Sequence, residues 1–310
     1  MKTYTIRRVR KAVIPMAGLG TRLFPVTRFL PKAFIPILDA TGSVIPLVQF
    51  LLEEAVQSGI EHVGLVVNPQ QRELFEKFFF DDLPYALEHD FPRGDSVDRY
   101  ILRMRHLCGH IELITQVEPR GFGDAVYRSA RWVGGEPFLL MLGDHLFQSH
   151  TTELCAQQLL KNYKNKTKSI VAISSLPIEE SHKRGVAKVL PVERRAREYH
   201  VVKIMEKPST QKAREQMLSP CIPDNQVFGF FGLYIFTPQI FEILEEDRTA
   251  EKRIEGEFQL THAMERLRSK SGFLAYEVDG VSMDIGNPDD YRKAFAFLYN
   301  SNNELVQNQN

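Results

Sequence analysis

The sequence has few cysteines, no excess of charge of either sign and no apolar run long enough to span a bilayer. The three cysteines, Cys108, Cys155 and Cys221, are too few and too widely spaced for a zinc cluster or a disulfide framework. They fit a reducing cytosol. Lysine and arginine together number 39, as do aspartate and glutamate. This balance gives no electrostatic reason to expect nucleic acid or an anionic membrane as a partner, so any anion-binding site must be local.

The N-terminus also lacks the pattern of a secretory leader. It is basic, but the apolar run from Val13 to Met16 is too short for a signal peptide and is followed by glycines and Arg22. We therefore expect a cytoplasmic protein. The 310 residues, 43% of them hydrophobic, suffice for one large α/β domain.

Strand and helix patterns alternate along the first third of the chain. Buried strands are expected at 12–16 and 62–67, and amphipathic helices at 45–58 and 70–80. This alternation predicts a Rossmann-like mixed, mostly parallel sheet flanked by helices, in which ligands bind beyond the carboxyl ends of the strands. We expect a single domain over 1–310 with a disordered polar tail from about residue 301. Later strands are expected at 111–117, 138–144, 169–176 and 225–237, and helices at 124–132 and 151–165.

The loop after the first strand has the composition of an anion site. It reads Ala17-Gly18-Leu19-Gly20-Thr21-Arg22. Two glycines let several backbone N–H groups approach one anion, and Arg22 adds a planar fork of donors that suits phosphate. Lys32 follows between two prolines. The loop can also be only a tight turn; it lacks the third glycine of the dinucleotide fingerprint and the Gly-Lys-Ser/Thr of a P-loop.

Three other sites carry candidate ligands. Gln116, before a loop with Gly121, offers an amide donor and acceptor that suit the imide edge of uracil or thymine, or it bonds its own backbone. Asp144 ends an apolar strand, as a ligand of a hard cation does, although it can equally cap a helix. Glu206 and Lys207 precede Pro208, which re-aims both side chains by breaking the strand; such pairs are also common on surfaces.

The string Gly-Leu-Gly-Thr-Arg-x-x-Pro, followed by Pro-Lys, resembles the signature of the sugar-1-phosphate nucleotidylyltransferases. It is most similar to that of the bacterial UTP–glucose-1-phosphate uridylyltransferases, and matching motifs run in order from Lys11 to Leu298. The resemblance implies Mg²⁺-dependent transfer of UMP from UTP to glucose 1-phosphate by direct displacement, giving UDP-glucose and pyrophosphate. It also implies a homo-oligomer, a dimer or a tetramer.

The resemblance implies a role for each motif. It assigns the phosphates to Arg22, Lys32 and Lys207, and the cation to Asp144 and Asp284, although Asp284 alone reads as a turn residue. It assigns the nucleotide to Ala17, Gly18, Leu19, Gly20, Gln116, Gly121 and Asp144. It assigns the sugar phosphate to Gly185, Glu206, Lys207 and Gly232.

Two positions depart from the pattern of the uridylyltransferases. Ala33 stands where an acid often follows the lysine, and Gly143-Asp144-His145 stands where Pro-Asp-Val is common. Gly-Asp is usual in the thymidylyl relatives. The same chemistry with dTTP or another hexose 1-phosphate therefore stays open, as does a non-catalytic paralogue that binds sugar nucleotides and regulates a partner.

Overall fold

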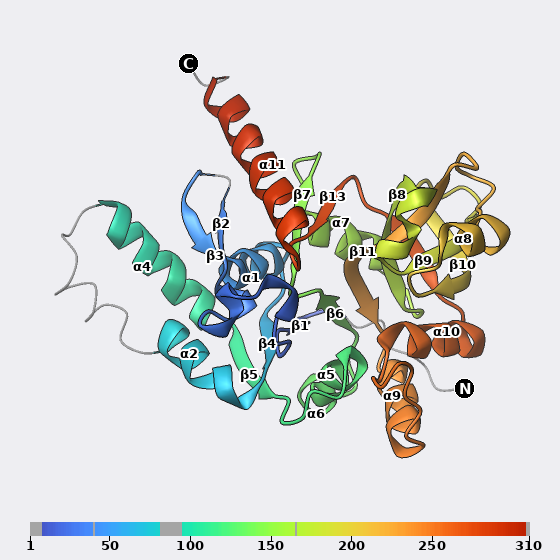
Figure 1. The fold of residues 1–310 in the computed structure, drawn as a ribbon, viewed down its shortest axis with the longest axis horizontal. Coiled ribbons are helices and arrows are strands. Elements are labelled where there is room, and N and C mark those ends of the chain that lie inside the picture. The colour runs from blue at the N-terminus through green and yellow to red at the C-terminus, as the bar shows by residue number, and fades with distance from the viewer. Residues whose placement is uncertain (1–7, 40, 81–94, 165, 308–310) are drawn as a thin grey trace.

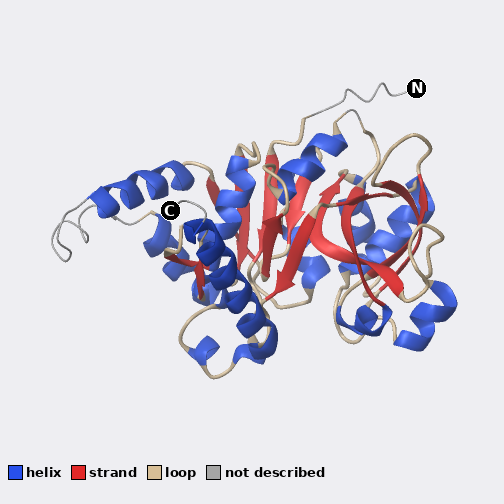
Figure 2. Ribbon diagram, turned by 90° about the horizontal axis from the view of Figure 1, so that it is seen from above, coloured by secondary structure: helices blue, strands red, loops and turns tan. Residues whose placement is uncertain are grey.

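The computed structural model describes residues 8–39, 41–80, 95–164 and 166–307. Its centre is a nine-stranded sheet in the order β5-β4-β1-β6-β11-β8-β12-β10-β9, with helices on both sides (Figures 1 and 2). The strands are β1 (Lys11–Pro15), β4 (His62–Val67), β5 (Ile111–Thr115), β6 (Phe138–Met141), β8 (Ile170–Pro177), β9 (Val186–Pro191), β10 (Glu198–Met205), β11 (Gln226–Phe236) and β12 (Leu274–Glu277).

The predicted class, a mixed α/β sheet, is confirmed. The half made of β5, β4, β1 and β6 is parallel throughout. Antiparallel pairs dominate the other half, where β11 runs against both β6 and β8. The parallel half places the carboxyl ends of β1 and β6 at one edge, so the loops that follow these strands lie together.

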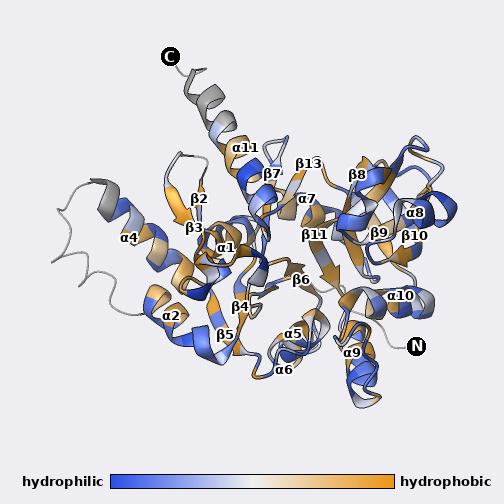
Figure 3. Cartoon of the chain, in the orientation of Figure 1, coloured by the Kyte–Doolittle hydropathy of each residue, from blue (hydrophilic) through white to orange (hydrophobic). Residues whose placement is uncertain are grey.

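Alternate residues of the strands face two apolar cores. In β1, Ala12 and Ile14 pack in one core and Val13 packs in the other, and all three are fully buried. Apolar residues accordingly concentrate on the central strands in Figure 3. The first core is covered by α1 (Leu47–Gln57), α2 (Pro69–Phe79), α4 (Asp95–Cys108) and α7 (Cys155–Tyr163). The second is covered by α5 (Phe122–Arg128), α6 (Ala130–Val133), α9 (Gln239–Thr249) and α10 (Leu260–Ser271).

Two short ribbons lie outside the main sheet. One pairs β2 (Pro36–Leu38) with β3 (Val44–Pro46), so the helix expected from residue 45 begins at Leu47. The other pairs β7 (His145–Ser149) with β13 (Gly280–Asp284). The sequence did not predict β7, because its partner strand comes more than a hundred residues later. The remaining helical segments are η1 (Thr21–Leu23), η2 (Val26–Arg28), η3 (Lys32–Phe34), η4 (Ile178–Lys183), α8 (Thr210–Gln216) and α11 (Pro288–Gln307).

The last helix, α11, points away from the sheet (Figure 1). It extends to Gln307, past the position near 301 where a disordered tail was expected. The segment after Pro288 contains no proline or glycine as far as Gln307, so nothing local ends the helix. Prolines, Gly94 and dense charges at 81–107 predict from the sequence that this segment leaves the sheet. Residues 81–94 lie outside the described residues, and the rest of the segment belongs to α4. No described helix combines the length and the hydropathy needed to cross a membrane.

Candidate active site

The loop after β1 forms one wall of a cavity of about 500 Å³. Gly20 adopts φ +66°, and an added Cβ there would lie 3.0 Å from the methyl group of Thr27, so the turn requires glycine. The hydroxyl of Thr27 donates a hydrogen bond of 2.9 Å to the Gly20 carbonyl and fixes the loop. We call this the glycine-loop cavity. Its lining includes Ala17, Gly18, Leu19, Gly20, Arg22, Lys32, Gln116, Gly121, Phe122 and Asp144. The structure thus brings the predicted nucleotide residues to one hollow.

Asp144 reaches this cavity because β6 ends beside β1. A Cβ on Gly143 would collide with the carbonyl of Pro15, so glycine is needed for this close approach. The carboxylate lies 2.6 Å from Lys32 Nζ and 2.8 Å from His145 Nδ1. Burial raises the pKa of Asp144, but the hydrogen bonds that its carboxylate accepts from His145 and Lys32, together with the positive charge of Lys32, outweigh it and hold the pKa well below its ordinary value. Asp144 is therefore ionised.

Asp284 comes to the same place on the β7–β13 ribbon. It ends β13 and pairs with His145 across the ribbon, while the N–H of Ile285 donates to the Asp144 carbonyl at 2.9 Å. Arg22 lies 4.0 Å from Asp144 Oδ2 and 3.9 Å from Asp284 Oδ2. Among the described residues, Asp144, His145 and Asp284 can offer one ligand atom each within 4.8 Å of one another. Two carboxylates at this spacing fit a divalent cation.

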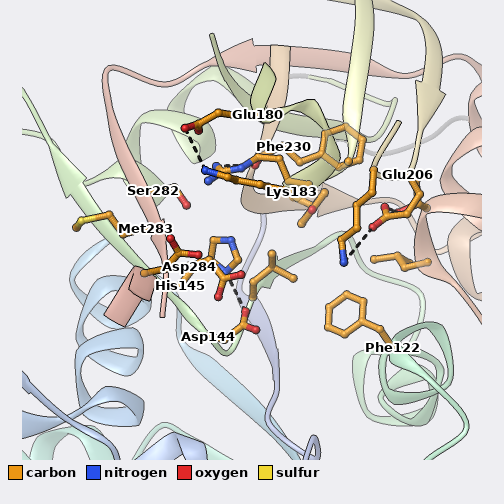
Figure 4. Close-up of a pocket in the computed structure, with 18 of the residues that line it drawn as sticks. Phe122, Asp144, His145, Glu180, Lys183, Glu206, Phe230, Ser282, Met283 and Asp284 are labelled. Atoms are coloured by element: carbon orange, nitrogen blue, oxygen red, sulfur yellow. Dashed lines mark hydrogen bonds and ion pairs between the residues drawn. The ribbon is translucent and has the colours of Figure 1, made fainter. Parts of the chain in front are cut away.

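A second cavity, of about 480 Å³, opens beside the first (Figure 4). We call it the Lys207 cavity. Glu206 and Lys207 lie where β10 ends, and Lys207 adopts φ +39°. Thr261 of α10 donates a 2.6 Å hydrogen bond to Glu206. The lining of the Lys207 cavity includes Arg22, Phe122, Asp144, His145, Arg184, Gly185, Glu206, Lys207, Phe230, Thr261 and Asp284.

Gly185 leaves space for two other residues that line this cavity, Phe230 and Glu206. A Cβ on Gly185 would collide with the ring of Phe230 and lie 3.2 Å from the Glu206 carboxylate, so only glycine leaves both in place. Gly232, by contrast, lines neither cavity. It adopts φ +103° on β11, and a Cβ there would meet His145 at 3.2 Å and Phe147 at 3.3 Å. The space that Gly232 leaves is filled by these two rings.

Gln116 differs from its expected use in one respect. Its Nε2 donates to Asp124 Oδ2 at 2.9 Å and to the Gly121 carbonyl at 3.3 Å. Both partners are acceptors, so both amide hydrogens are engaged and only Oε1 is left to meet a ligand. Asp124 is itself fully buried and held by Arg128 and Arg248. The sequence offered a donor and an acceptor here, but Asp124 restricts the amide to one role.

The two cavities share Arg22, Phe122 and Asp144. Arg22 and Asp144 were predicted from the sequence. Phe122 and Arg184 carry no signal beyond their neighbourhood to Gly121 and Gly185. Thr261 ends the string Glu257-Phe-Gln-Leu-Thr, which resembles a family motif, but it was not predicted as a site residue. His145 was noted only as a departure from the pattern, although an imidazole directly after a strand-end aspartate is itself a candidate cation ligand.

The nucleotidyl transferase family matches residues 11–301 of this chain. The chain is 34% identical over 282 residues to the UTP–glucose-1-phosphate uridylyltransferase of Bacillus subtilis (strain 168), covering 91% of this chain and 88% of that protein. It is 32% identical to the enzyme of the same name from Staphylococcus haemolyticus (strain JCSC1435), covering 91% and 89%.

Solved structures agree with these relatives. A UDP-glucose pyrophosphorylase in complex with UDP-glucose superposes with a TM-score of 0.75 at 28% identity, covering 94% of this chain and 99% of that one. An apo UDP-glucose pyrophosphorylase gives a TM-score of 0.78, also at 28% identity, covering 94% and 98%. The family match covers nearly the whole chain, the fold is shared with these structures, and the two cavities meet at charged residues. The chain therefore belongs to the nucleotidyl transferase family.

Proposed function

We propose that this protein transfers UMP from UTP to glucose 1-phosphate, giving UDP-glucose and releasing pyrophosphate. The observation that carries the proposal is the junction of the two cavities at Arg22 and Asp144. A reaction between two phosphate esters needs two adjoining sites whose common wall neutralises charge. The relatives at 34% and 32% identity, whose names give this reaction, support the choice of substrates.

The reaction is a direct displacement in which an oxygen of the sugar phosphate attacks the α-phosphorus of UTP and pyrophosphate leaves. The nucleophile is already anionic, so no general base is required. The obstacle is the repulsion between the two esters, and positioning with charge neutralisation supplies the catalysis. In this proposal Arg22 and Lys32 bind the triphosphate and the leaving pyrophosphate. Lys207 binds the attacking phosphate from the other cavity.

Asp144 and Asp284 hold a divalent cation in this proposal, with Mg²⁺ as the expected ion. The cation would supply charge neutralisation and orientation of the phosphate oxygens when bound. Glu206, held by Thr261, accepts hydrogen bonds from sugar hydroxyls in the Lys207 cavity. Gln116 uses its single available atom, Oε1, to accept from the N3–H of uracil, because Asp124 engages its amide hydrogens. CTP has no hydrogen at N3, so this contact disfavours it.

The test is pyrophosphate release by the purified chain with a panel of nucleotides (UTP, dTTP, CTP, ATP) and of hexose 1-phosphates. Highest kcat/KM with UTP and glucose 1-phosphate supports the proposal. A higher kcat/KM with dTTP or with another sugar would replace the substrate pair and keep the chemistry. Binding of sugar nucleotides without turnover of any pair would instead indicate a regulatory paralogue. Asp144→Asn serves as the inactive reference and isolates the contribution of this site.

A further inference from the structure

His145 is a member of the Asp144–His145–Asp284 group that the proposed reaction does not yet use. We propose that His145 Nδ1 is a third protein ligand of the cation, so this site binds a divalent transition-metal ion such as Mn²⁺ more tightly than the Mg²⁺ that the family resemblance implies. The inference rests on the cation site of the proposed function and adds a nitrogen donor to it.

The strand pairing places His145 beside the two acids independently of side-chain rotamers. His145 begins β7 and stands directly opposite Asp284, the last residue of β13, in the antiparallel register. Opposite residues of an antiparallel pair project from the same face, with Cβ atoms about 4.5–5.5 Å apart. Asp144 is the preceding residue, and its carbonyl accepts from Ile285 N–H, which ties the end of β6 to the end of β13. One ribbon end therefore presents all three side chains.

The distances suit a single small ion. His145 Nδ1 lies 2.8 Å from Asp144 Oδ1, and the three ligand atoms lie within 4.8 Å of one another. Neighbouring ligands of an octahedral ion with bonds of about 2.1 Å are about 3 Å apart, and opposite ligands are about 4.2 Å apart. Small side-chain movements therefore suffice to bring three donors to one ion. Nδ1 donates a proton to the ionised Asp144 in the ligand-free chain, and the ion takes the place of that proton, which is released to solvent. The ring then binds in its Nε2–H tautomer through the lone pair of Nδ1.

The imidazole is also held in place. Its side chain is only 9% exposed, and it occupies the space that the missing Cβ of Gly232 leaves on β11. The ring of Phe147 lies nearly parallel to it, with centroids 6.4 Å apart. Figure 4 shows the ring between Asp144 and Asp284 at the wall of the Lys207 cavity. A ligand that is already oriented loses little conformational freedom on binding.

The donor set decides which ion is preferred. Carboxylate oxygens suit Mg²⁺, Ca²⁺ and Mn²⁺, whereas imidazole nitrogen favours transition metals over Mg²⁺. An Asp–His–Asp set combines the two kinds of donor, and Mn²⁺ accepts both. Without the histidine, the two aspartates provide only oxygen ligands, and the affinity of the site for Mg²⁺ is then closer to its affinity for Mn²⁺. The nitrogen of His145 thus sets the discrimination between the two ions.

The test is pulsed electron paramagnetic resonance of Mn²⁺ bound to the full chain, with Mn²⁺ alone and with Mn²⁺ plus UTP. The expected result is a ¹⁴N coupling from a directly bound imidazole, which changes when the histidines carry ¹⁵N. In His145→Gln this coupling disappears, and the Kd for Mn²⁺ rises at least about tenfold, since loss of even an outer partner of a metal ligand costs 10–100-fold. The Kd for Mg²⁺ changes less.

His150→Gln is the matched control. His150 lies just past the other end of β7, is half exposed and contacts Asp279 rather than the cation group, so its replacement leaves coupling and affinity unchanged. Mn²⁺ bound to the unaltered chain without nitrogen coupling, or no Mn²⁺ bound under either condition, overturns the inference without requiring any variant to fold. Pyrophosphate release is measured separately. Turnover without nitrogen coupling would contradict only this inference, whereas nitrogen coupling without turnover would contradict only the proposed reaction.

Discussion

Lys32 Nζ lies 2.6 Å from Asp144 Oδ2, although the two residues are separated by 112 positions in the sequence. Lys32 belongs to η3 and Asp144 follows β6, so the contact joins the glycine-loop cavity to the end of the parallel sheet. Arg22 lies 4.0 Å from the same oxygen. Two cations and two carboxylates thus balance one another in the ligand-free chain, and an incoming phosphate competes with Asp144 for Lys32.

Lys32→Met is expected to lower kcat/KM for UTP by about 10²–10³, because one donor aimed at developing charge contributes about 3–4 kcal/mol to the transition state. Initial-rate measurements of pyrophosphate release at varied UTP check this. Lys212→Met, on α8 and outside both cavities, is the control. A Lys32→Met variant with turnover close to that of the control would contradict the role of Lys32.

Lys207→Ala is expected to lose at least about 10² in kcat/KM for glucose 1-phosphate while its melting temperature stays unchanged. Lys207 is 58% exposed and its ion pair with Glu206 is a loose one of 3.9 Å, so the fold does not depend on it. Rates at varied glucose 1-phosphate and a thermal melt check both statements. Lys203→Ala is the control: Lys203 lies on β10, four residues before Lys207, with its amine against Gln216, and its replacement keeps full activity.

Gly185→Ala is expected to raise the KM for glucose 1-phosphate by about tenfold or more and to leave the KM for UTP nearly unchanged. The added methyl group would collide with the ring of Phe230, which lines the Lys207 cavity, so the ring must shift within that wall. Gly135→Ala adds a methyl group where no atom lies within 4 Å and serves as control. Equal effects on both substrates would show that Gly185 acts on the whole fold instead.

Glu54→Gln is expected to stabilise the protein above pH 7 and to change little near pH 5. Glu54 is buried on α1 and accepts a 2.7 Å hydrogen bond from Ala156 N–H at the start of α7. Burial raises the pKa of Glu54 from 4.5 to about 7, against the effect of the hydrogen bonds from Ala156 and Cys155. Between these values the folded state holds a proton that the unfolded state has lost, so stability falls as the pH rises from about 4.5 to about 7.

That loss is at most about 3 kcal/mol, since one pKa unit corresponds to about 1.4 kcal/mol. A neutral glutamine keeps an acceptor for Ala156 and avoids the buried charge. Denaturant unfolding of both chains at pH 5 and pH 8 measures the difference. Glu112→Gln, at an exposed position of β5, controls for the removal of one carboxylate. If the free energies of unfolding of the two chains differ by the same amount at pH 5 and at pH 8, the pKa of Glu54 is not raised.

The sequence predicted elements well where neighbouring residues determine them. The strand β4 has the predicted bounds, His62–Val67, because five consecutive buried residues leave no alternative. The strand β7 escaped prediction because its hydrogen bonds depend on β13. The reading of Gln116 needed Asp124, whose burial is a tertiary property. The surroundings of Phe34 are also a tertiary property. Phe34 follows Ala33, where the sequence departs from the uridylyltransferase pattern, and its ring packs edge-on against Phe75 and Phe78 with centroids 4.9 and 5.2 Å apart.

The candidate site likewise contains residues that local sequence identifies and residues that depend on tertiary contacts. Strand ends and glycine turns drew attention to the glycine loop, Gln116, Asp144 and Glu206–Lys207, since their positions are set by local sequence, whereas the roles of Gly185, Gly232 and Asp284 came from the family resemblance. Gly232 was assigned to the sugar by its motif, whereas packing shows that its missing side chain makes room for His145 and Phe147. Which rings fill such a space depends on the crossing of β11 with the β7–β13 ribbon, and no local pattern encodes that crossing.

The helix α11 sets how far the C-terminus can be altered. Its first turns line the Lys207 cavity with Asp290, Lys293, Ala294 and Phe297, whereas its later turns run outward (Figure 1). Twenty helical residues span about 30 Å, so an affinity tag fused after the last residue is carried clear of the cavity mouth. Shortening the chain to residue 300 spares all four lining residues, whereas shortening it to residue 290 removes Lys293, Ala294 and Phe297 from the cavity wall.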